Sequence, residues 1–168
     1  MVLDTPGKQY YESPCSFPIV CLIGTVAKIL ARLIASCLLL AARLKRLLNP
    51  NQCGSVPALS TYDACLALFN DVKTQPRSRL KVSSLFLHIK AGFDNVDNAT
   101  LASIVRASGI LPYLVSWVSS FLCERSFTLI MQGAPGTPAP VNVGALQGSP
   151  ISPVLFLLYV APLHFRIP

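Results

Sequence analysis

Two stretches of the sequence place polar side chains directly after apolar segments, a position from which they could line a cleft. The first, residues 82–97, begins as an apolar run rich in strand-forming residues and predicts a buried strand around residues 85–89. The run breaks at Gly92, presents Phe93 and Asp94, and leads into a second polar turn. A strand that ends in a turn with an acidic residue commonly directs a polar group into a cleft. The pattern predicts a site without naming its chemistry.

The second stretch, residues 143–158, follows about fifty residues later and contains the turn Gln147-Gly148-Ser149. Together the two stretches resemble the palm motifs of reverse transcriptases, specifically those of non-LTR (LINE-like) retrotransposons. That family typically writes the first motif as F-L-D-I-K-G-A-F-D-N-V-D and the second as G-V-P-Q-G-S-P-L-S-P-L-L-F. The resemblance continues upstream and covers most of the chain. In the connector before the first motif it includes Asn51, Gln52, Gly54, Ser60, Thr61, Asp63 and Ala64.

The resemblance implies RNA-directed DNA synthesis that depends on Mg²⁺. Such nucleotidyl transfer uses two metal ions about 3.5–4 Å apart, and Mg²⁺ prefers carboxylates and substrate phosphates as ligands. In the family, one metal carboxylate ends the first palm strand and two come from a later tyrosine-x-aspartate-aspartate hairpin. His88 occupies the first of these positions, and imidazole is better suited to zinc, copper or iron. No aspartate or glutamate follows Glu124, so the hairpin pair is also missing from the sequence.

We therefore expect a truncated and degenerate copy in which no catalytic or metal site is intact. His88 is interpreted as a substituted position left from the ancestral site. Mg²⁺, the cofactor in the family, is not expected to bind productively, and the chain is not expected to polymerise DNA. By resemblance its partners are RNA and DNA, and no small-molecule partner is indicated. The alternative is a non-catalytic remnant that binds nucleic acid.

Five residues keep positions that the family uses to bind nucleotide or template. The resemblance places Phe93 where the family has an aromatic residue that discriminates between sugars at the 2′ position. It places the turn Gln147-Gly148-Ser149 against the template and the incoming nucleotide. A lysine near the first motif could meet a phosphate electrostatically. Ordinary roles stay open for the aromatic as a core residue, for the lysine as a solvated side chain and for Asp94 as a turn residue. The five are Lys90, Phe93, Gln147, Gly148 and Ser149.

The composition is that of a folded chain with a basic excess. The 168 residues suffice for one domain with a core and are too few for a complete polymerase. Hydrophobic residues make up 52% of the chain and charged residues 12%, which argues against disorder. The net charge of +7 suits a polyanionic partner, either nucleic acid or an acidic membrane surface, although a mild basic excess is also common without such a role.

The six cysteines show no C-x-x-C pair and no nearby histidine, so neither zinc binding nor redox chemistry is supported. Residues 1–16 lack the pattern of a signal peptide. We therefore expect an intracellular protein, without distinguishing nucleus from cytoplasm.

The longest helical signal covers residues 25–48. Basic residues fall opposite an apolar repeat, which predicts an amphipathic helix whose leucine-rich face packs on a fingers domain. Its longest charge-free part, residues 33–42, is about half the length of a membrane span, so a helix on a membrane surface is the less favoured alternative. The apolar repeat consists of Val26, Ile29, Leu30, Leu33, Cys37, Leu40, Leu44 and Leu47, and the basic residues are Lys28, Arg32, Arg43 and Arg46.

The remaining patterns predict an α/β fold, a partial polymerase right hand with helical fingers and an incomplete palm in which helices accompany an antiparallel sheet. We assign residues 1–18 to an N-terminal arm, 19–80 to the fingers-like region and 81–168 to the partial palm. Ser60 or Thr61 should cap a helix, and Ser152 and Pro153 should be the cap and first residue of the last one. The expected helices cover residues 61–73, 100–107, 111–123 and 154–163, the strands 126–132 and 141–145, and a loop 135–140.

Overall fold

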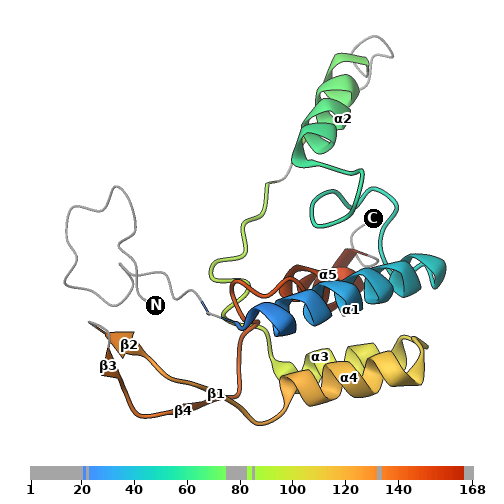
Figure 1. Ribbon diagram of the computed structural model, residues 1–168. Helices are drawn as coiled ribbons and strands as arrows, with labels where there is room; N and C mark the ends of the chain where they lie inside the picture. The colour runs from blue at the N-terminus through green and yellow to red at the C-terminus, as the bar shows by residue number, and fades with distance from the viewer. Residues whose placement is uncertain (1–20, 22, 75–82, 85, 132–133, 165–168) are drawn as a thin grey trace.

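Five helices and four short strands make up the part of the chain that the computed structural model describes, residues 21, 23–74, 83–84, 86–131 and 134–164 (Figure 1). The predicted arm at residues 1–18 lies outside these ranges. The helices are α1 (Thr25–Leu44), α2 (Thr61–Thr74), α3 (Asn98–Ala107), α4 (Pro112–Leu122) and α5 (Ser152–His164). The strands are β1 (Arg125–Phe127), β2 (Ile130–Met131), β3 (Ala134–Pro135) and β4 (Ala139–Val141).

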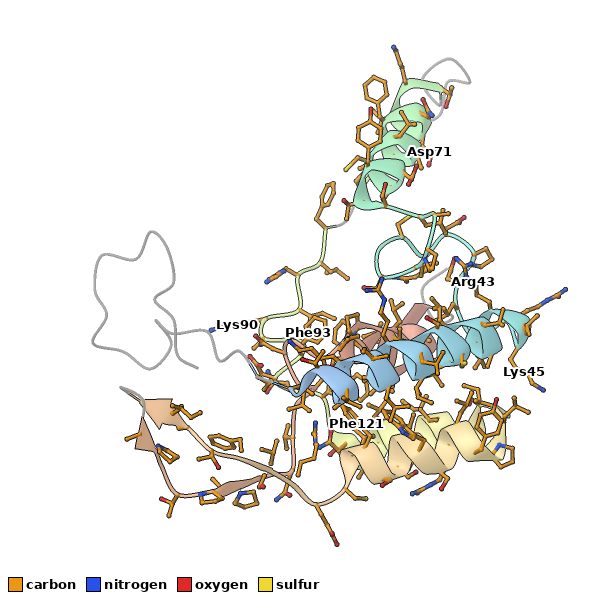
Figure 2. All side chains as sticks on the ribbon, in the orientation of Figure 1. Arg43, Lys45, Asp71, Lys90, Phe93 and Phe121 are labelled. Atoms are coloured by element: carbon orange, nitrogen blue, oxygen red, sulfur yellow. The ribbon has the colours of Figure 1, made fainter. Side chains whose placement is uncertain are left out.

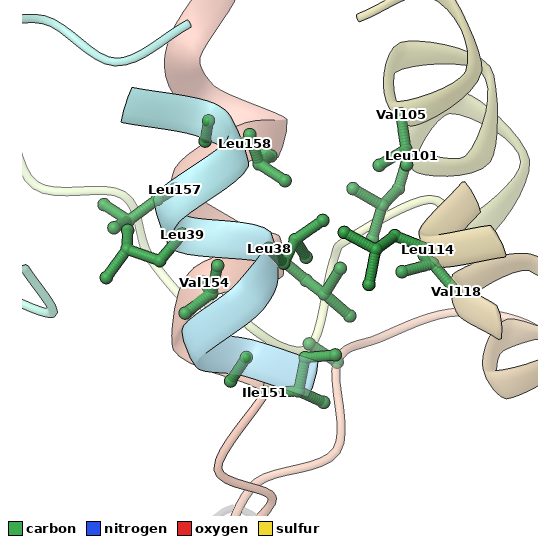
Figure 3. Close-up of a cluster of buried hydrophobic side chains, with 14 of the residues drawn as sticks. Leu38, Leu39, Leu101, Val105, Leu114, Val118, Ile151, Val154, Leu157 and Leu158 are labelled. Carbon is green, nitrogen blue, oxygen red and sulfur yellow. The ribbon is translucent and has the colours of Figure 1, made fainter. Parts of the chain in front are cut away.

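Helix α5 lies at the centre of the hydrophobic core. Its sequence, SPVLFLLYVAPLH, contains no aspartate, glutamate, lysine or arginine, so its sides need cover from other elements. Helices α1 and α3 pack on α5, and α4 packs on α3 (Figure 1). Figure 3 shows the buried side chains that meet between these helices. They include Leu38, Leu39, Leu101, Val105, Leu114, Val118, Ile151, Val154, Leu157 and Leu158.

The strands form two short antiparallel pairs. β1 pairs with β4, with Arg125 opposite Val141, and β2 pairs with β3, with Ile130 opposite Pro135. In Figure 1 the resulting ribbon extends away from the helices. The combination of helices with a small antiparallel sheet confirms the predicted fold class.

The predicted positions of the strands and of the loop between them are partly wrong. The strand expected over residues 126–132 is divided into β1 and β2, with Gln132 outside the described ranges. The loop expected over residues 135–140 contains Pro135 of β3 and Pro140 of β4. Proline lacks an N–H group and is tolerated in an edge strand. Both strands of a two-stranded ribbon are edge strands, so these prolines do not prevent pairing.

The buried strand predicted around residues 85–89 does not form. Residues 86–89 adopt no regular structure, and Leu85 lies outside the described ranges. Phe86 and Leu87 are 80% and 74% exposed. A strand needs a neighbour that takes up its backbone hydrogen bonds, and none of the four strands described lies beside this segment. The prediction is wrong here because strand-forming residues do not supply a partner.

Helix α1 packs through the face opposite to the predicted one. The leucine-rich stripe points outward, and Val26, Leu33 and Leu44 are among its exposed residues. The other face packs on α5 and buries the small side chains of Ala31, Ala35 and Ala42. The periodicity is therefore present, but the choice of the packed face is wrong. The buried residues of α1 are Ala31, Ala35, Leu38, Leu39 and Ala42.

Helix α1 ends at Leu44, four residues before the predicted end. The N–H of Arg46 bonds to the carbonyl of Arg43, and the N–H of Leu47 bonds to the carbonyl of Ala42. Arg46 has a φ of 55°. These bonds form a Schellman motif, which usually contains glycine at the left-handed position. Arginine takes this position here, so no glycine in the sequence marks the end of the helix.

By length and composition alone, α1 is also apolar enough to cross a membrane. A core helix passes the same test, and part of α1 is buried within the protein.

Helix α2 stands apart from the core, and all of its residues are exposed (Figure 1). Its start is fixed locally, because the Ser60 N–H donates to the Asp63 carboxylate at 2.7 Å and the Asp63 N–H donates to Ser60 Oγ at 3.3 Å. These hydrogen bonds hold the pKa of Asp63 below its ordinary value. The reciprocal pair is a capping box and confirms the predicted cap at Ser60.

Helices α3 and α4 also agree with the sequence. Asp97 accepts the N–H of Thr100 at 2.7 Å and caps α3, which lowers the pKa of this carboxyl. Pro112 is the first residue of α4, where its missing N–H leaves no bond unmade.

Replacing Leu38 by alanine should lower the free energy of unfolding by about 2–5 kcal/mol, because Leu38 is 0% exposed and its loss leaves a cavity between the helices. The matched control is Leu40→Ala on the same helix, where the side chain is 59% exposed and a change within about 0.5 kcal/mol is expected. Urea unfolding of the two variants measures the difference. Equal losses would contradict the assignment of the buried face of α1.

Candidate active-site remnant

The first motif forms a compact turn in place of a strand end. The carbonyl of Ala91 accepts hydrogen bonds from the backbone N–H groups of Asp94 and Asn95, both at 3.1 Å. The side-chain amide of Asn95 donates to the same oxygen at 3.0 Å. These bonds close a turn from Ala91 to Asn95 and fix the backbone of Phe93 and Asp94 within it.

The second motif forms a turn directly before α5. The N–H of Ser149 donates to the carbonyl of Leu146 at 3.2 Å. Gly148, within this turn, has a φ of 97° and is exposed. A left-handed conformation of this kind favours glycine, and the backbone of Gly148 is open to solvent.

A hydrogen bond between side chains joins the two turns. Gln147 Nε2 donates to Asp94 Oδ1 at 2.7 Å, across 53 residues of sequence. Two backbone bonds support it, from the Ala145 N–H to the Phe93 carbonyl at 2.7 Å and from the Gly144 N–H to the Val96 carbonyl at 2.8 Å. The structure thus brings together the two stretches that the sequence singled out.

Gly144 permits this close approach. Its φ is 93°, and a Cβ atom at this position would lie 3.1 Å from the backbone oxygen of Asp94. That distance is shorter than ordinary van der Waals contact. A side chain at residue 144 would therefore push the two turns apart.

Phe93 is half-buried beside these turns. Its ring stacks on Phe156 of α5 with 4.7 Å between the ring centroids. A Cβ atom on Gly92 would come within 3.0 Å of the Phe156 ring, so the glycine leaves room for the stack. Phe93 packs against the core and also lines a cavity of about 310 Å³. The core role and the site role of Phe93 are therefore compatible.

The wall of this cavity includes the Gln147-Gly148-Ser149 turn and Ser152. Ser149 and Ser152 are 4% and 2% exposed, and their hydroxyl oxygens have no hydrogen-bond partner among the described residues. Ser152 lies inside α5, because the Leu155 N–H bonds to the Ile151 carbonyl at 3.0 Å. The prediction that Ser152 caps α5 is wrong by one residue, because the tight turn before it puts Ile151 at the cap.

Lys90 and His88 lie outside the cavity. Both are exposed, and neither has a side-chain hydrogen bond to another described residue. Figure 2 shows Lys90 near Phe93. The described residues contain no group of three His, Cys, Asp or Glu that could hold a metal, so His88 belongs to no such cluster.

The residues present do not fit a Mg²⁺ site. Mg²⁺ needs several oxygen ligands in octahedral geometry, and the carboxylate of Asp94 already accepts the Gln147 amide. Asp97 is engaged with Thr100 at the start of α3. We assign no metal-dependent step to these residues.

One residue near the site was not predicted from the sequence. Arg125 Nη2 donates to the carbonyl of Gly144 at 2.7 Å. Burial lowers the pKa of this guanidinium, while Cys21 nearby raises it. A signal was available, because Glu124 and Arg125 are the only aspartate, glutamate, lysine or arginine residues between Arg106 and Arg166. A pair of charges isolated in so apolar a stretch calls for a structural partner.

Comparison with known proteins identifies the family. The family model of the reverse transcriptase (RNA-dependent DNA polymerase) matches residues 16–168. The chain belongs to the reverse transcriptase family. This confirms the resemblance of the two motifs and explains the mixture of helices and short antiparallel strands as part of a polymerase domain.

Three relatives illustrate the reach of the similarity. The chain is 27% identical over 158 residues to the probable RNA-directed DNA polymerase from transposon X-element of Drosophila melanogaster, covering 94% of this chain and 17% of that protein. It is 26% identical over 163 residues to the corresponding protein from transposon BS of the same species, covering 97% and 18%. It is 25% identical over 143 residues to the transposon TX1 uncharacterized 149 kDa protein of Xenopus laevis, covering 85% and 11%. The chain thus spans less than a fifth of the length of these transposon proteins.

Replacing Gly144 by alanine should lower the free energy of unfolding by about 1–3 kcal/mol, because the substitution adds both a strained φ and a close contact with Asp94. Gly109→Ala is the matched control. Gly109 has a φ of 66° but nothing within 4 Å of its Cβ position, so it reports the strain alone. Chemical unfolding of both variants should show the larger loss for Gly144→Ala. A loss no greater than that of Gly109→Ala would show that the two turns do not meet at Gly144.

Proposed function

We propose that this reverse transcriptase domain binds nucleic acid at the joined turns and does not itself synthesise DNA. The observation that carries the proposal is the Gln147–Asp94 hydrogen bond. It holds the nucleotide- and template-binding turn of the family beside Phe93, while the position of the first metal carboxylate is occupied by His88.

Three features support binding of RNA or DNA. The chain carries a net charge of +7, which favours a polyanionic partner. Lys90 is exposed close to the site, where an ammonium group can meet a phosphate. The exposed backbone of Gly148 and the partly buried ring of Phe93 line one cavity, and an aromatic face beside a glycine turn suits a base or sugar.

The chemistry of the metal ligands supports the proposed lack of polymerase activity. Two-metal catalysis requires negative oxygen ligands that hold both ions near the reacting phosphate. An imidazole at residue 88 supplies no negative charge. In the part of the chain that the structure describes, no group of three His, Cys, Asp or Glu is placed to hold a metal.

The division into a fingers-like region at residues 19–80 and a partial palm at residues 81–168 is part of the same proposal. Helix α1 of the first region packs on α5 of the second. The two regions therefore share one hydrophobic core at their junction.

We expect no primer extension by this chain on an RNA template in the presence of Mg²⁺ or Mn²⁺. His88→Asp should not restore extension, because one carboxylate provides only part of a two-metal site. An active reverse transcriptase assayed in parallel is the positive control. Template-dependent products above the background of the protein-free reaction would refute the proposed inactivity.

A gel shift with an RNA template annealed to a DNA primer should show binding that weakens steeply as salt increases. Lys90→Ala should reduce the slope of log affinity against log salt by about one, the change expected from the loss of one phosphate contact. The matched control is Lys45→Ala, because Lys45 is also exposed but lies at the far end of α1 in Figure 2. For Lys45→Ala the slope of log affinity against log salt should equal that of the unmodified chain.

Binding that is absent or insensitive to salt would remove the nucleic-acid proposal. The outward leucine stripe of α1 then favours a second candidate, a protein that lies on a membrane surface. Flotation of the same sample with anionic liposomes distinguishes this candidate, provided that aggregates are removed first.

A further inference from the structure

Arg125 occupies an unusual place at the start of β1. It is the first residue of the strand and follows α4 after only two residues. Its guanidinium is partly buried, and one nitrogen, Nη2, donates to the carbonyl of Gly144 at 2.7 Å. Nε and Nη1 are buried without a partner among the residues that the structure describes. Burying a charged group with so few bonds is unfavourable, so stability alone does not account for an arginine at this position.

The acceptor of this hydrogen bond lies at the point where the two motifs meet. The N–H of Gly144 donates to the Val96 carbonyl, and a Cβ on Gly144 would contact the Asp94 backbone. The next residue, Ala145, donates to the Phe93 carbonyl. A displacement of the Gly144 carbonyl would therefore move the segment that ends in Gln147.

We propose that Arg125 is a positioning residue for the proposed nucleic-acid site, and that it acts by fixing the Gly144 peptide so that Gln147 meets Asp94. The part of this inference that concerns nucleic acid rests on the proposed function. The part that concerns the Gln147–Asp94 bond stands on the contacts of the free protein.

Arg125 acts through the backbone and does not contact nucleic acid. Two of its three nitrogens are buried from solvent, and the third is engaged with Gly144. A phosphate could not reach these groups without opening the junction. The salt dependence of binding should therefore not include Arg125, in contrast to Lys90.

The test compares Arg125→Met with Arg125→Lys. Methionine keeps an apolar chain of similar length and removes the hydrogen bond, whereas lysine keeps an ammonium group that can still donate to a carbonyl. Arg106→Met is the matched control, because Arg106 is an exposed arginine on α3 whose only described side-chain bond is a long one, 3.5 Å, to Ser119 Oγ. Circular dichroism establishes that each variant is folded.

The first measurement is the NMR signal of the Gln147 side-chain amide in the free, isotope-labelled protein, assigned by its loss in Gln147→Ala. Arg125→Met should shift this signal and speed its hydrogen exchange roughly tenfold, as expected when a hydrogen bond to a charged group no longer holds the segment. Arg125→Lys should restore part of the protection. An unchanged Gln147 signal in folded Arg125→Met would overturn the proposal, whether or not the protein binds nucleic acid.

The second measurement is affinity for the RNA template annealed to a DNA primer. Arg125→Met should weaken binding roughly tenfold without changing the salt slope, and the effect should largely disappear in a Gln147→Ala background, since both changes disrupt one unit. Fully additive losses, or a slope reduced by about one, would overturn positioning in favour of an independent or direct phosphate contact. If the unmodified chain shows no binding, the proposed function fails, and the amide signal alone decides the role of Arg125.

Discussion

The requirement to cover helix α5 determines the arrangement of most other elements. This helix carries no Asp, Glu, Lys or Arg, so exposing it to water would be unfavourable along much of its surface. The alanine face of α1 lies against one side, and α3, itself supported by α4, lies against another. Phe156 uses a further side to stack on Phe93. The same helix therefore organises the core and supports the site, so that a change in its packing would reach both.

The two motifs are held together mainly by backbone geometry. Gly144 and Ala145 donate their N–H groups to the first motif, and among the described residues the Gln147–Asp94 bond is the one hydrogen bond between side chains of the two motifs. A junction of this kind depends on Gly144 and on the two turns and, in our proposal, on Arg125. The arrangement of the two turns therefore does not depend on the side chain of residue 88.

The sequence predicted what depends on local chemistry and missed what depends on partners. Ser60 was predicted as a cap, because a cap acts within one helical turn. The prediction of a strand around residues 85–89 was wrong, since a strand must pair with a neighbouring strand. The prediction of the packed face of α1 was wrong, because leucine content does not reveal which of two apolar faces meets α5. Phe93 and Gln147 were placed together only through the resemblance of the motifs, and Arg125 was missed because its partner is a backbone carbonyl distant in sequence.

The isolation of α2 means that no single unfolding equilibrium describes the chain. Its 14 residues have local support from the capping box and from Lys73 above the Phe69 ring, and none of them is buried. Helices of about this length are marginal in water when nothing packs against them. The segment will therefore open and close on its own, independently of the cooperative unit around α5. Its order becomes a property that a binding partner can supply, and calorimetric enthalpies of the free chain will report mainly the remaining helices.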